Sequence, residues 1–260
     1  MFFSPQIINT RITMYDQYAS HWQQAVKGPS RIQGKWRSFV RGSLLDFYSI
    51  FDCKAETNFL RCLYCHYVFD NQVEDFKMIV SQLKKIGRFI DTDTCMAMIH
   101  GAKDIDDKYF HLSFDDGFRN NYTNAVPILL ENEIPAIFFV PTSIVESSWA
   151  TTYNYCKQTM HYKGVIEMLK WNDIKDMISH GFEIGSHTRT HARFSSISNN
   201  EDLMDEEITG SKHELEAITG KECKYISWPF GKLSDADNKS LEIVKRAGYC
   251  GCFGAFRGSC

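Results

Sequence analysis

Two short segments of the sequence carry the residues best able to do chemistry, and the first of them is acidic. The sequence SFDDG at residues 113–117 places Asp115 and Asp116 next to each other. Adjacent carboxylates raise each other's pKa unless something neutralises one of them. A metal ion ligated by one aspartate would do this and would leave the other free as a base. An Asp-Asp-Gly turn in which one aspartate caps the next helix is the alternative for this segment alone.

The second segment, GSHTRTH at residues 185–191, holds His187 and His191 four residues apart. Two histidines at this spacing can converge on one cation if the segment turns helically, and histidine is the commonest ligand of zinc-like metals. Two solvated loop histidines are the alternative. Together the two segments supply two histidines and one carboxylate, which leaves coordination positions open for water and substrate. The combination therefore favours a catalytic metal site over a closed structural one.

A third segment, ISWPFG at residues 226–231, combines aromatic residues with proline and glycine. This composition suits a rigid groove wall with exposed backbone groups, of the kind against which sugars stack. We expect substrate contacts from Trp228, Pro229, Phe230 and Gly231. A simple transition from strand to loop is the alternative.

The surrounding pattern, from residue 59 onward, is an alternation of strands and helices. Strands are predicted at 59–69, 109–114, 134–140, 182–185, 225–228 and 249–256, and helices at 72–86, 121–133, 172–179, 200–219 and 235–247. Repeated β-then-α units indicate an α/β fold with a parallel sheet and helices outside, either doubly wound or closed into a barrel. Because functional residues of such folds lie just after the strands, the three segments should converge on one face.

The composition is that of an ordinary globular protein. Among its 260 residues, 43% are hydrophobic and 23% are charged, which excludes a disordered tail, a collagen-like repeat and a small disulfide scaffold. A formal charge of −3 gives no electrostatic footprint for nucleic acid or an anionic membrane. Residues 1–58 lack a clean period and hold a scattered basic stretch, so we expect an N-terminal extension of unknown role, with a basic docking arm as the alternative. Residues 59–260 would form the catalytic domain.

The nine cysteines are the unusual feature of the composition. An odd number cannot all pair within the chain, and the N-terminus lacks the features of a secretory signal. The longest apolar run, at residues 134–140, is far shorter than the about 20 residues of a membrane span. We therefore expect free thiols in a soluble, cytoplasmic protein, unless an upstream segment is missing. The sequence CLYCH at residues 62–66 matches the haem-attachment pattern, but we favour neither haem nor a structural zinc or redox pair there.

The three segments, in this order, resemble the signature motifs of the polysaccharide deacetylases, the NodB-like group that forms carbohydrate esterase family 4. The resemblance covers about residues 60–256 and includes the intervening run IPAIFFV at 134–140. The opening LYCH at 63–66 is similar to the branch that de-N-acetylates poly-N-acetylglucosamine. The resemblance implies a distorted (β/α) barrel and a divalent metal ion, usually Zn²⁺.

The resemblance also implies a role for each motif residue. Asp116, His187 and His191 would be the metal ligands and Asp115 the general base, an assignment that the residue pattern alone leaves open. The reaction would be hydrolysis of N-acetyl groups on an amino-sugar-containing poly- or oligosaccharide, by attack of an activated water on the acetamide. The alternatives are an amidase or O-acetyl esterase of the same fold with another substrate, and a non-catalytic carbohydrate-binding relative.

Two departures from the family pattern concern the acid and the base. Many members have an arginine two residues before the proline of the third motif, where this chain has Ser227, so Asp115 would be held differently. Many also carry a later Leu-x-x-His segment that supplies a general acid, and this chain ends at Cys260 without one. Either the domain is C-terminally incomplete or the acid comes from elsewhere. His66, after the first predicted strand, is our candidate, and a histidine packed under a loop is the alternative.

Overall fold

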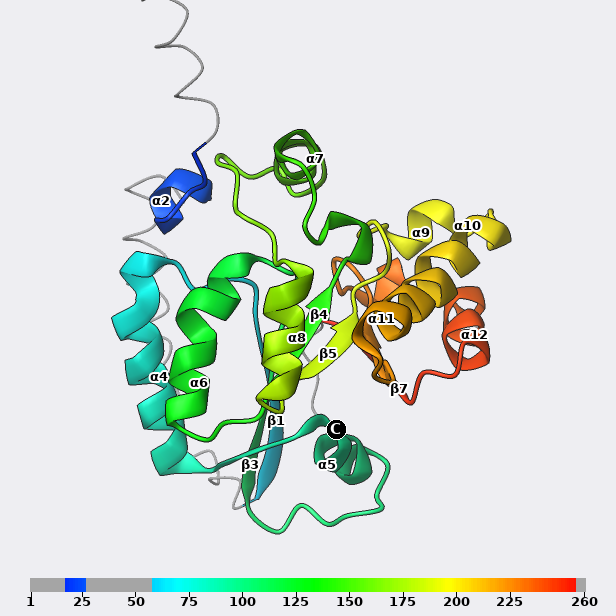
Figure 1. Cartoon of the computed structure of the whole chain (residues 1–260). Coiled ribbons are helices and arrows are strands. Elements are labelled where there is room, and N and C mark those ends of the chain that lie inside the picture. Colours follow the sequence, from blue (N-terminus) through cyan, green and yellow to red (C-terminus); the bar gives the residue numbers. More distant parts are fainter. Residues whose placement is uncertain (1–16, 27–57, 256–260) are drawn as a thin grey trace, which may run out of the picture.

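The computed structural model describes residues 17–26 and 58–255 (Figure 1). The strands are β1 Phe59–Cys65, β2 Arg88–Ile90, β3 Lys108–Phe114, β4 Ile137–Val140, β5 Glu183–Ser186, β6 Tyr225–Ser227 and β7 Gly251–Phe253. The α-helices are α2 Trp22–Ala25, α4 Val73–Ile86, α5 Thr92–Ile99, α6 Val126–Glu131, α7 Trp149–Asn154, α8 Trp171–Ser179, α9 Phe194–Ile197, α10 Glu201–Asp205, α11 Ser211–Thr219 and α12 Asn238–Arg246. Shorter 3₁₀ or π-helical turns are η1 Asp70–Gln72, η2 Asn121–Ala125, η3 Thr142–Ile144, η4 Tyr155–Thr159, η5 Glu206–Gly210 and η6 Leu233–Asp235.

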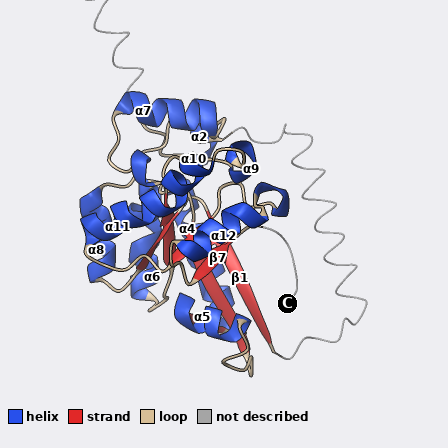
Figure 2. Cartoon of the chain, turned by 90° about the vertical axis from the view of Figure 1, so that its right-hand side faces the viewer, coloured by secondary structure: helices blue, strands red, loops and turns tan. Residues whose placement is uncertain are grey.

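The described strands form one parallel sheet in the order β1-β3-β4-β5-β6-β7, with β2 paired to the first half of β3. His111 of β3 stacks on Phe253 of β7 with ring centroids 5.4 Å apart, although β4, β5 and β6 lie between these strands in the sheet. Contact across so many strands requires the sheet to curl toward closure. The predicted distorted (β/α) barrel is confirmed as a curled, parallel half-barrel wrapped by helices (Figure 2).

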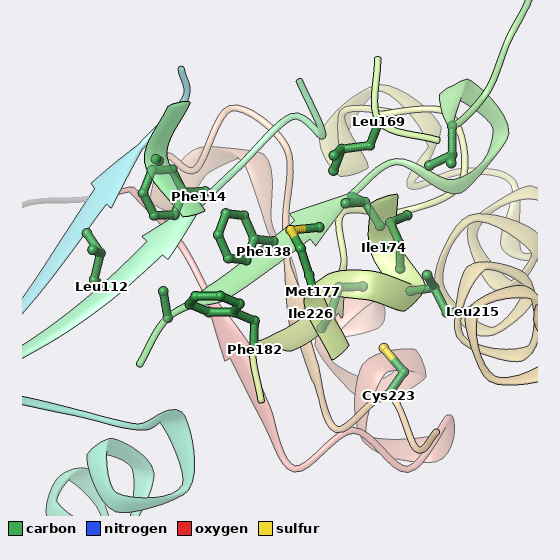
Figure 3. Close-up of a cluster of buried hydrophobic side chains, with 14 of the residues drawn as sticks. Leu112, Phe114, Phe138, Leu169, Ile174, Met177, Phe182, Leu215, Cys223 and Ile226 are labelled. Atoms are coloured by element: carbon green, nitrogen blue, oxygen red, sulfur yellow. The ribbon is translucent and has the colours of Figure 1, made fainter. Parts of the chain in front are cut away.

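The outer face of the sheet packs against the apolar faces of α4, α6, α8, α11 and α12. Figure 3 shows the centre of this core, where Phe114, Phe138 and Phe182 lie together. The rings of Phe114 and Phe138 stack with centroids 4.8 Å apart, and Phe182 meets Phe138 edge-on at 5.6 Å. These offset and edge-on contacts add to the free energy gained by removing the rings from water. The core thereby fixes β3, β4 and β5 against the helices.

The predicted elements are present, with altered bounds and some omissions. The first strand ends at Cys65 instead of continuing to residue 69, and the helix predicted at 200–219 is divided into α10, η5 and α11. The sequence analysis missed α2, β2, α5, α7 and α9. These elements are short, and α5 and α7 begin at side-chain caps: Asp91 accepts from the Thr94 N–H at 2.7 Å and Ser148 from the Thr151 N–H at 3.3 Å. No long apolar period marks them.

Part of the N-terminal segment packs on the rest of the chain. Ala25 of α2 is buried in a second apolar cluster with Phe69, Phe118 and Tyr155, and its carbonyl accepts the backbone N–H of Gly164 at 3.0 Å. The helix lies near α7, at the end of the molecule opposite α5 (Figures 1 and 2). The division of domains at residues 58 and 59 stays a prediction.

Several sequence-based expectations concern residues outside the described part of the chain. They are the basic stretch of Lys27, Arg31, Lys35, Arg37 and Arg41, and the last residues of the chain, 256–260.

Within the described residues no disulfide joins the seven cysteines. None of the helices described is long and apolar enough to cross a membrane.

Substitution of a core ring tests the packing of the sheet on its helices. Phe138 is buried between Phe114 and Phe182, so Phe138→Ala should lower the free energy of unfolding by about 3–5 kcal/mol through lost contacts and a cavity. Met78 on α4 is exposed, and Met78→Ala should change it by less than about 0.5 kcal/mol. Urea unfolding measures both. Equal losses in the two variants would contradict this account of the core.

Candidate functional site

The loops that follow β3, β5 and β6 meet at one edge of the sheet. Parallel strands place their carboxyl ends on the same side, so the loops after them share that edge. Asp116 Oδ1 lies 3.4 Å from His187 Nε2 and 3.1 Å from His191 Nε2. All three side chains are buried, and Asp116 is only 1% exposed. The convergence expected for the two chemistry-bearing segments is present in the fold.

A hydrogen bond from the ring nitrogen that points away from Asp116 determines the tautomer of His187. His187 Nδ1 lies 2.7 Å from the carbonyl oxygen of Ser227, which can only accept, so Nδ1 carries the proton. In the neutral ring, Nε2 then has a lone pair that faces the carboxylate oxygen of Asp116. Two lone pairs at 3.4 Å require a positive charge between or on them, either a second ring proton or a cation.

The donor atoms of this cluster fit a divalent metal ion. The donors of Asp116, His187 and His191 all lie within 4.8 Å of one another. Ligands at about 2.0–2.1 Å from a tetrahedral zinc lie about 3.3 Å apart, which matches the two contacts of Asp116. Asp116 Oδ2 is also buried without a hydrogen-bond partner among the described residues. Two histidines and one carboxylate are a ligand set typical of open metal sites.

The ring of His191 is positioned by packing. Its Nδ1 is buried without a hydrogen-bond partner among the described residues, whereas ligating histidines usually donate from their second nitrogen. Two aromatic rings meet it edge-on: Tyr155 with its centroid at 5.7 Å and Phe230 with its centroid at 5.0 Å. These contacts restrict the ring plane and aim Nε2 at Asp116.

The two neighbouring aspartates lie in different electrostatic environments. Burial raises the pKa of Asp115, and the positive charges of His187 and His66 oppose that rise. Burial also acts to raise the pKa of Asp116, but hydrogen bonds to His187 and His191 outweigh it and hold this pKa well below its usual range. When their surroundings separate the pKa values of two adjacent carboxyl groups in this way, the two groups can take different roles in a reaction.

Left-handed backbone conformations are concentrated in the three motif loops. The φ angles are +71° at Asp116, +64° at Thr188, +64° at His191 and +65° at Phe230. Each such non-glycine residue costs about 1–3 kcal/mol and persists only where the surroundings hold it. At Thr188, one such constraint is the backbone N–H, which donates to Ser186 Oγ at 3.0 Å. The loops are thereby held in shapes that an isolated turn would not keep.

Glu207 anchors the loop between the two histidines, and the sequence analysis did not assign it this role. Its carboxylate accepts the backbone N–H groups of Arg189 at 3.0 Å and Thr190 at 2.8 Å, and the Thr190 hydroxyl at 2.6 Å. Glu207 is buried in η5, beneath the loop. A glutamate on the buried side of the amphipathic stretch 200–219 could have indicated this role, because a carboxylate is rarely buried without a partner.

His66 lies at the same edge of the sheet as the two aspartates. The N–H of Asp115 donates to the carbonyl of Cys65 at 2.9 Å, and Asn121 Nδ2 donates to the carbonyl of His66 at 2.9 Å. A charged His66 acts on both carboxylates, lowering the pKa of Asp115 and of Asp116. The structure thus brings His66 toward the cluster, and its role as an acid stays a prediction.

The third motif contributes one exposed ring. Trp228 is only 6% exposed, belongs to the apolar core and donates from Nε1 to the carbonyl of Lys232 at 3.2 Å. Pro229 and Gly231 are also buried. Phe230 is 38% exposed, and the Arg193 guanidinium lies 3.7 Å from its ring centroid. Of the four residues predicted to contact substrate, Phe230 is therefore the one that presents a side-chain surface.

A cavity of about 340 Å³ lies away from this site. Its lining includes Asp93 of α5, Glu183 at the beginning of β5 and Lys224 just before β6, so it lies at the amino ends of these strands and not at their carboxyl ends. It contains none of the motif residues, so the candidate site is the open edge around Asp116.

Comparison with known proteins identifies the family of this chain. Residues 102–251 match the family model described as polysaccharide deacetylase. The protein YxkH of Bacillus subtilis (strain 168), whose name places it among the polysaccharide deacetylases, is 25% identical over 153 residues, which cover 58% of this chain and 46% of YxkH. The chain thus spans about half the length of the curated relatives it matches.

Solved structures with a similar fold include two bacterial proteins. IcaB from Ammonifex degensii gives a TM-score of 0.64 at 23% identity, covering 76% of this chain and 84% of IcaB. A de-N-acetylase from Aggregatibacter actinomycetemcomitans gives 0.59 at 17% identity, covering 75% and 87%. These two likenesses concern the fold.

The family match extends over more than half of the chain and includes all three motifs. The resemblance stated from the motifs is thereby confirmed. The chain belongs to the polysaccharide deacetylase family of hydrolases, carbohydrate esterase family 4, which act on acetylated carbohydrate.

Proposed function

We propose that this chain is a metal-dependent deacetylase that removes N-acetyl groups from an amino-sugar-containing poly- or oligosaccharide. The observation that carries the proposal is the buried cluster of Asp116, His187 and His191, with Asp115 adjacent to it, in a chain of this family. The name of the Aggregatibacter de-N-acetylase, whose fold is similar, supports the choice of an N-acetyl substrate.

The proposed metal ligands are Asp116, His187 and His191, and the proposed ion is Zn²⁺, because the donor types and spacing suit it. Such an ion supplies Lewis-acid activation of a water and of the acetyl carbonyl. Ser227 would orient His187 through its carbonyl, and Glu207 would hold the loop that carries both histidines. These groups keep the ligand atoms aimed at one point before substrate arrives.

Asp115 is the proposed general base. It would accept a proton from the attacking water, whose oxygen becomes bonded to the acetyl carbon. His66 would then donate a proton to the departing sugar nitrogen as the C–N bond breaks. Acetate and a free amino sugar result, so the proton taken by one side chain balances the one given by the other. The hydrogen bond between the Asp115 N–H and the carbonyl of Cys65 keeps the segments of these two residues together.

Phe230 is the proposed platform for a sugar ring. Phe230 is 38% exposed and its ring centroid lies 5.0 Å from that of His191, so a sugar stacked on the face opposite the Arg193 guanidinium would lie beside the metal ligands. The buried Trp228, Pro229 and Gly231 would act by supporting this ring from below. Activity measurements distinguish this proposal from three alternatives: an O-acetyl esterase of the same fold, an amidase with another substrate and a non-catalytic sugar-binding relative.

Replacement of the proposed base tests the reaction. Asp115→Asn should reduce acetate release from N-acetylglucosamine oligomers by about 10²–10⁴-fold, because the amide cannot accept the water's proton. Metal content, measured by elemental analysis, should be kept. Asp237→Asn is the matched control, since Asn caps helix α12 as well as Asp does, and it should retain full activity. Full activity in Asp115→Asn would exclude this residue as the base, and release of acetate only from O-acetylated sugars would favour the esterase.

Replacement of a proposed ligand tests the metal site. His187→Ala removes one of three donors, so both bound metal and acetate release should be lost. Removal of metal from the unmodified chain by a chelator should abolish activity, and added Zn²⁺ should restore it. Activity that persists in the chelated protein would contradict metal dependence.

Glu207 is proposed as a positioning residue, which a metal titration can test. Glu207→Gln should weaken metal binding by about 10–100-fold, because the amide replaces one of the two carboxylate oxygens that hold the histidine loop. Glu206→Gln is the matched control: Glu206 is exposed and pairs with Arg189 on the same loop, so its loss should have little effect. Competition with a chelator measures both affinities. Equal affinities in the two variants would overturn the role of Glu207.

A further inference from the structure

A second cluster of metal-ligating side chains lies inside the curled sheet. Cys62 of β1, Cys95 of α5 and His111 of β3 place their donor atoms within 4.8 Å of one another. The two Sγ atoms are 3.7 Å apart. Cys95 and His111 are buried, whereas Cys62 is exposed to solvent. The cluster contains two sulfur donors and no carboxylate, which separates it chemically from the site around Asp116.

The topology of the sheet assembles this cluster from distant parts of the chain. Cys62 and His111 are direct neighbours in the register of β1 and β3. Cys62 and Cys65 are three residues apart on one strand, so they point to opposite faces and cannot act together. Cys95 instead reaches Cys62 from α5, one of the helices that the sequence analysis missed. The spacing of cysteines along the sequence therefore did not indicate this group.

The hydrogen bonds around His111 leave one buried ring nitrogen with a lone pair. Burial raises the pKa of Glu183, and hydrogen bonds from the backbone N–H and the hydroxyl of Thr92 oppose that rise. Thr92 donates its backbone N–H to Glu183 Oε1 at 3.1 Å, and its hydroxyl oxygen lies 3.2 Å from His111 Nε2. When that oxygen accepts from Nε2, His111 Nδ1 has a lone pair, and Nδ1 has no hydrogen-bond partner among the described residues. His111 is 1% exposed, so this nitrogen is shielded from bulk solvent.

This arrangement matches the surroundings of metal-ligating histidines. Such rings commonly donate their second N–H to an oxygen that is itself hydrogen-bonded, which fixes the tautomer and the ring plane. Here Thr92 and Glu183 provide that chain, and Phe253 stacks on the ring with centroids 5.4 Å apart. The imidazole is held in one orientation with its free nitrogen buried.

We propose that Cys62, Cys95 and His111 form a second metal site, for a thiophilic divalent cation of the Zn²⁺ class. Two thiolates at about 2.3 Å from a tetrahedral zinc lie about 3.8 Å apart, close to the observed 3.7 Å. Soft sulfur donors with one imidazole select such cations over Mg²⁺ or Ca²⁺. A fourth coordination position would open on the solvent side, at Cys62.

The two sites are separate and would have different consequences. His111 of β3 precedes Asp115, which follows the end of that strand, by four residues, about 13 Å along an extended chain. A cation at the cysteine site would join the edge strand β1 to β3 and to α5. The site would therefore stabilise the fold at the edge of the sheet, independently of the proposed deacetylase chemistry.

Cobalt binding distinguishes the sites because only one of them contains sulfur. In the full chain under reducing conditions, Co²⁺ should produce a thiolate-to-metal charge-transfer absorption in the near ultraviolet. Cys62→Ser should remove this absorption and lower the bound cobalt by one ion per chain. Cys250→Ser, at another exposed cysteine outside the cluster, is the matched control and should keep both. His187→Ala should keep the absorption while losing the other ion.

The absorption decides the inference whether or not the proposed deacetylase site binds cobalt. Its absence in the unmodified, reduced chain would overturn the proposal. Its persistence in Cys62→Ser would do the same, and an unchanged circular dichroism spectrum shows that this variant folds. A Cys62–Cys95 disulfide found by mass spectrometry, with no absorption after reduction, would replace the metal site by a redox pair.

Discussion

A buried carboxylate between two imidazoles is the interaction on which the organisation of this molecule depends. Asp116 is almost fully enclosed, and an isolated ionised carboxylate in such a place is strongly unfavourable. A proton or a cation held by the Nε2 atoms of His187 and His191 compensates it, and because this attraction acts at short range the three side chains must keep their positions. The three side chains come from two loops, so the backbone beneath them must be rigid. The parallel sheet provides this rigidity, because β3 and β5 are both paired to β4 and packed on the same helices.

The loops themselves are held by buried polar contacts that oppose local backbone preference. A left-handed threonine such as Thr188 is unfavourable by itself, and it lies next to His187 in the loop that also contains His191. Glu207 accepts three hydrogen bonds from that loop, and Ser186 adds another from beneath it. The hydrogen bonds below the loop therefore stabilise a backbone conformation that is unfavourable by itself. Part of the free energy of folding is used to hold the loop in this preorganised shape.

The sequence predicted those features that depend on local pattern and on the chirality of β/α units. Asp116, His187 and His191 meet because each follows a strand of one parallel sheet, a rule that requires no knowledge of side-chain packing. Features that depend on tertiary contacts were not predictable in the same way. Nothing in the alternation of residues distinguishes the buried Trp228 from the exposed Phe230, and the role of Glu207 depends on a loop 17 residues away in sequence. Short capped helices such as α5 also lack a periodic signal.

The alternation of residues along β3 relates the two clusters to each other. Leu112 and Phe114 point outward into the helix-covered core, so His111 and Ser113 must point into the curled sheet. A polar side chain placed there is shielded from water and has to find partners on other strands or on α5. His111 meets this requirement at one nitrogen through Thr92; the other has no hydrogen-bond partner in the described part of the chain, and the two thiols lie near it. The middle of β3 thus places a histidine nitrogen near two thiols, and the loop after β3 places a carboxylate near two histidines. The alternation of side chains along the strand determines which face His111 is on, and the curl of the sheet brings its neighbours close.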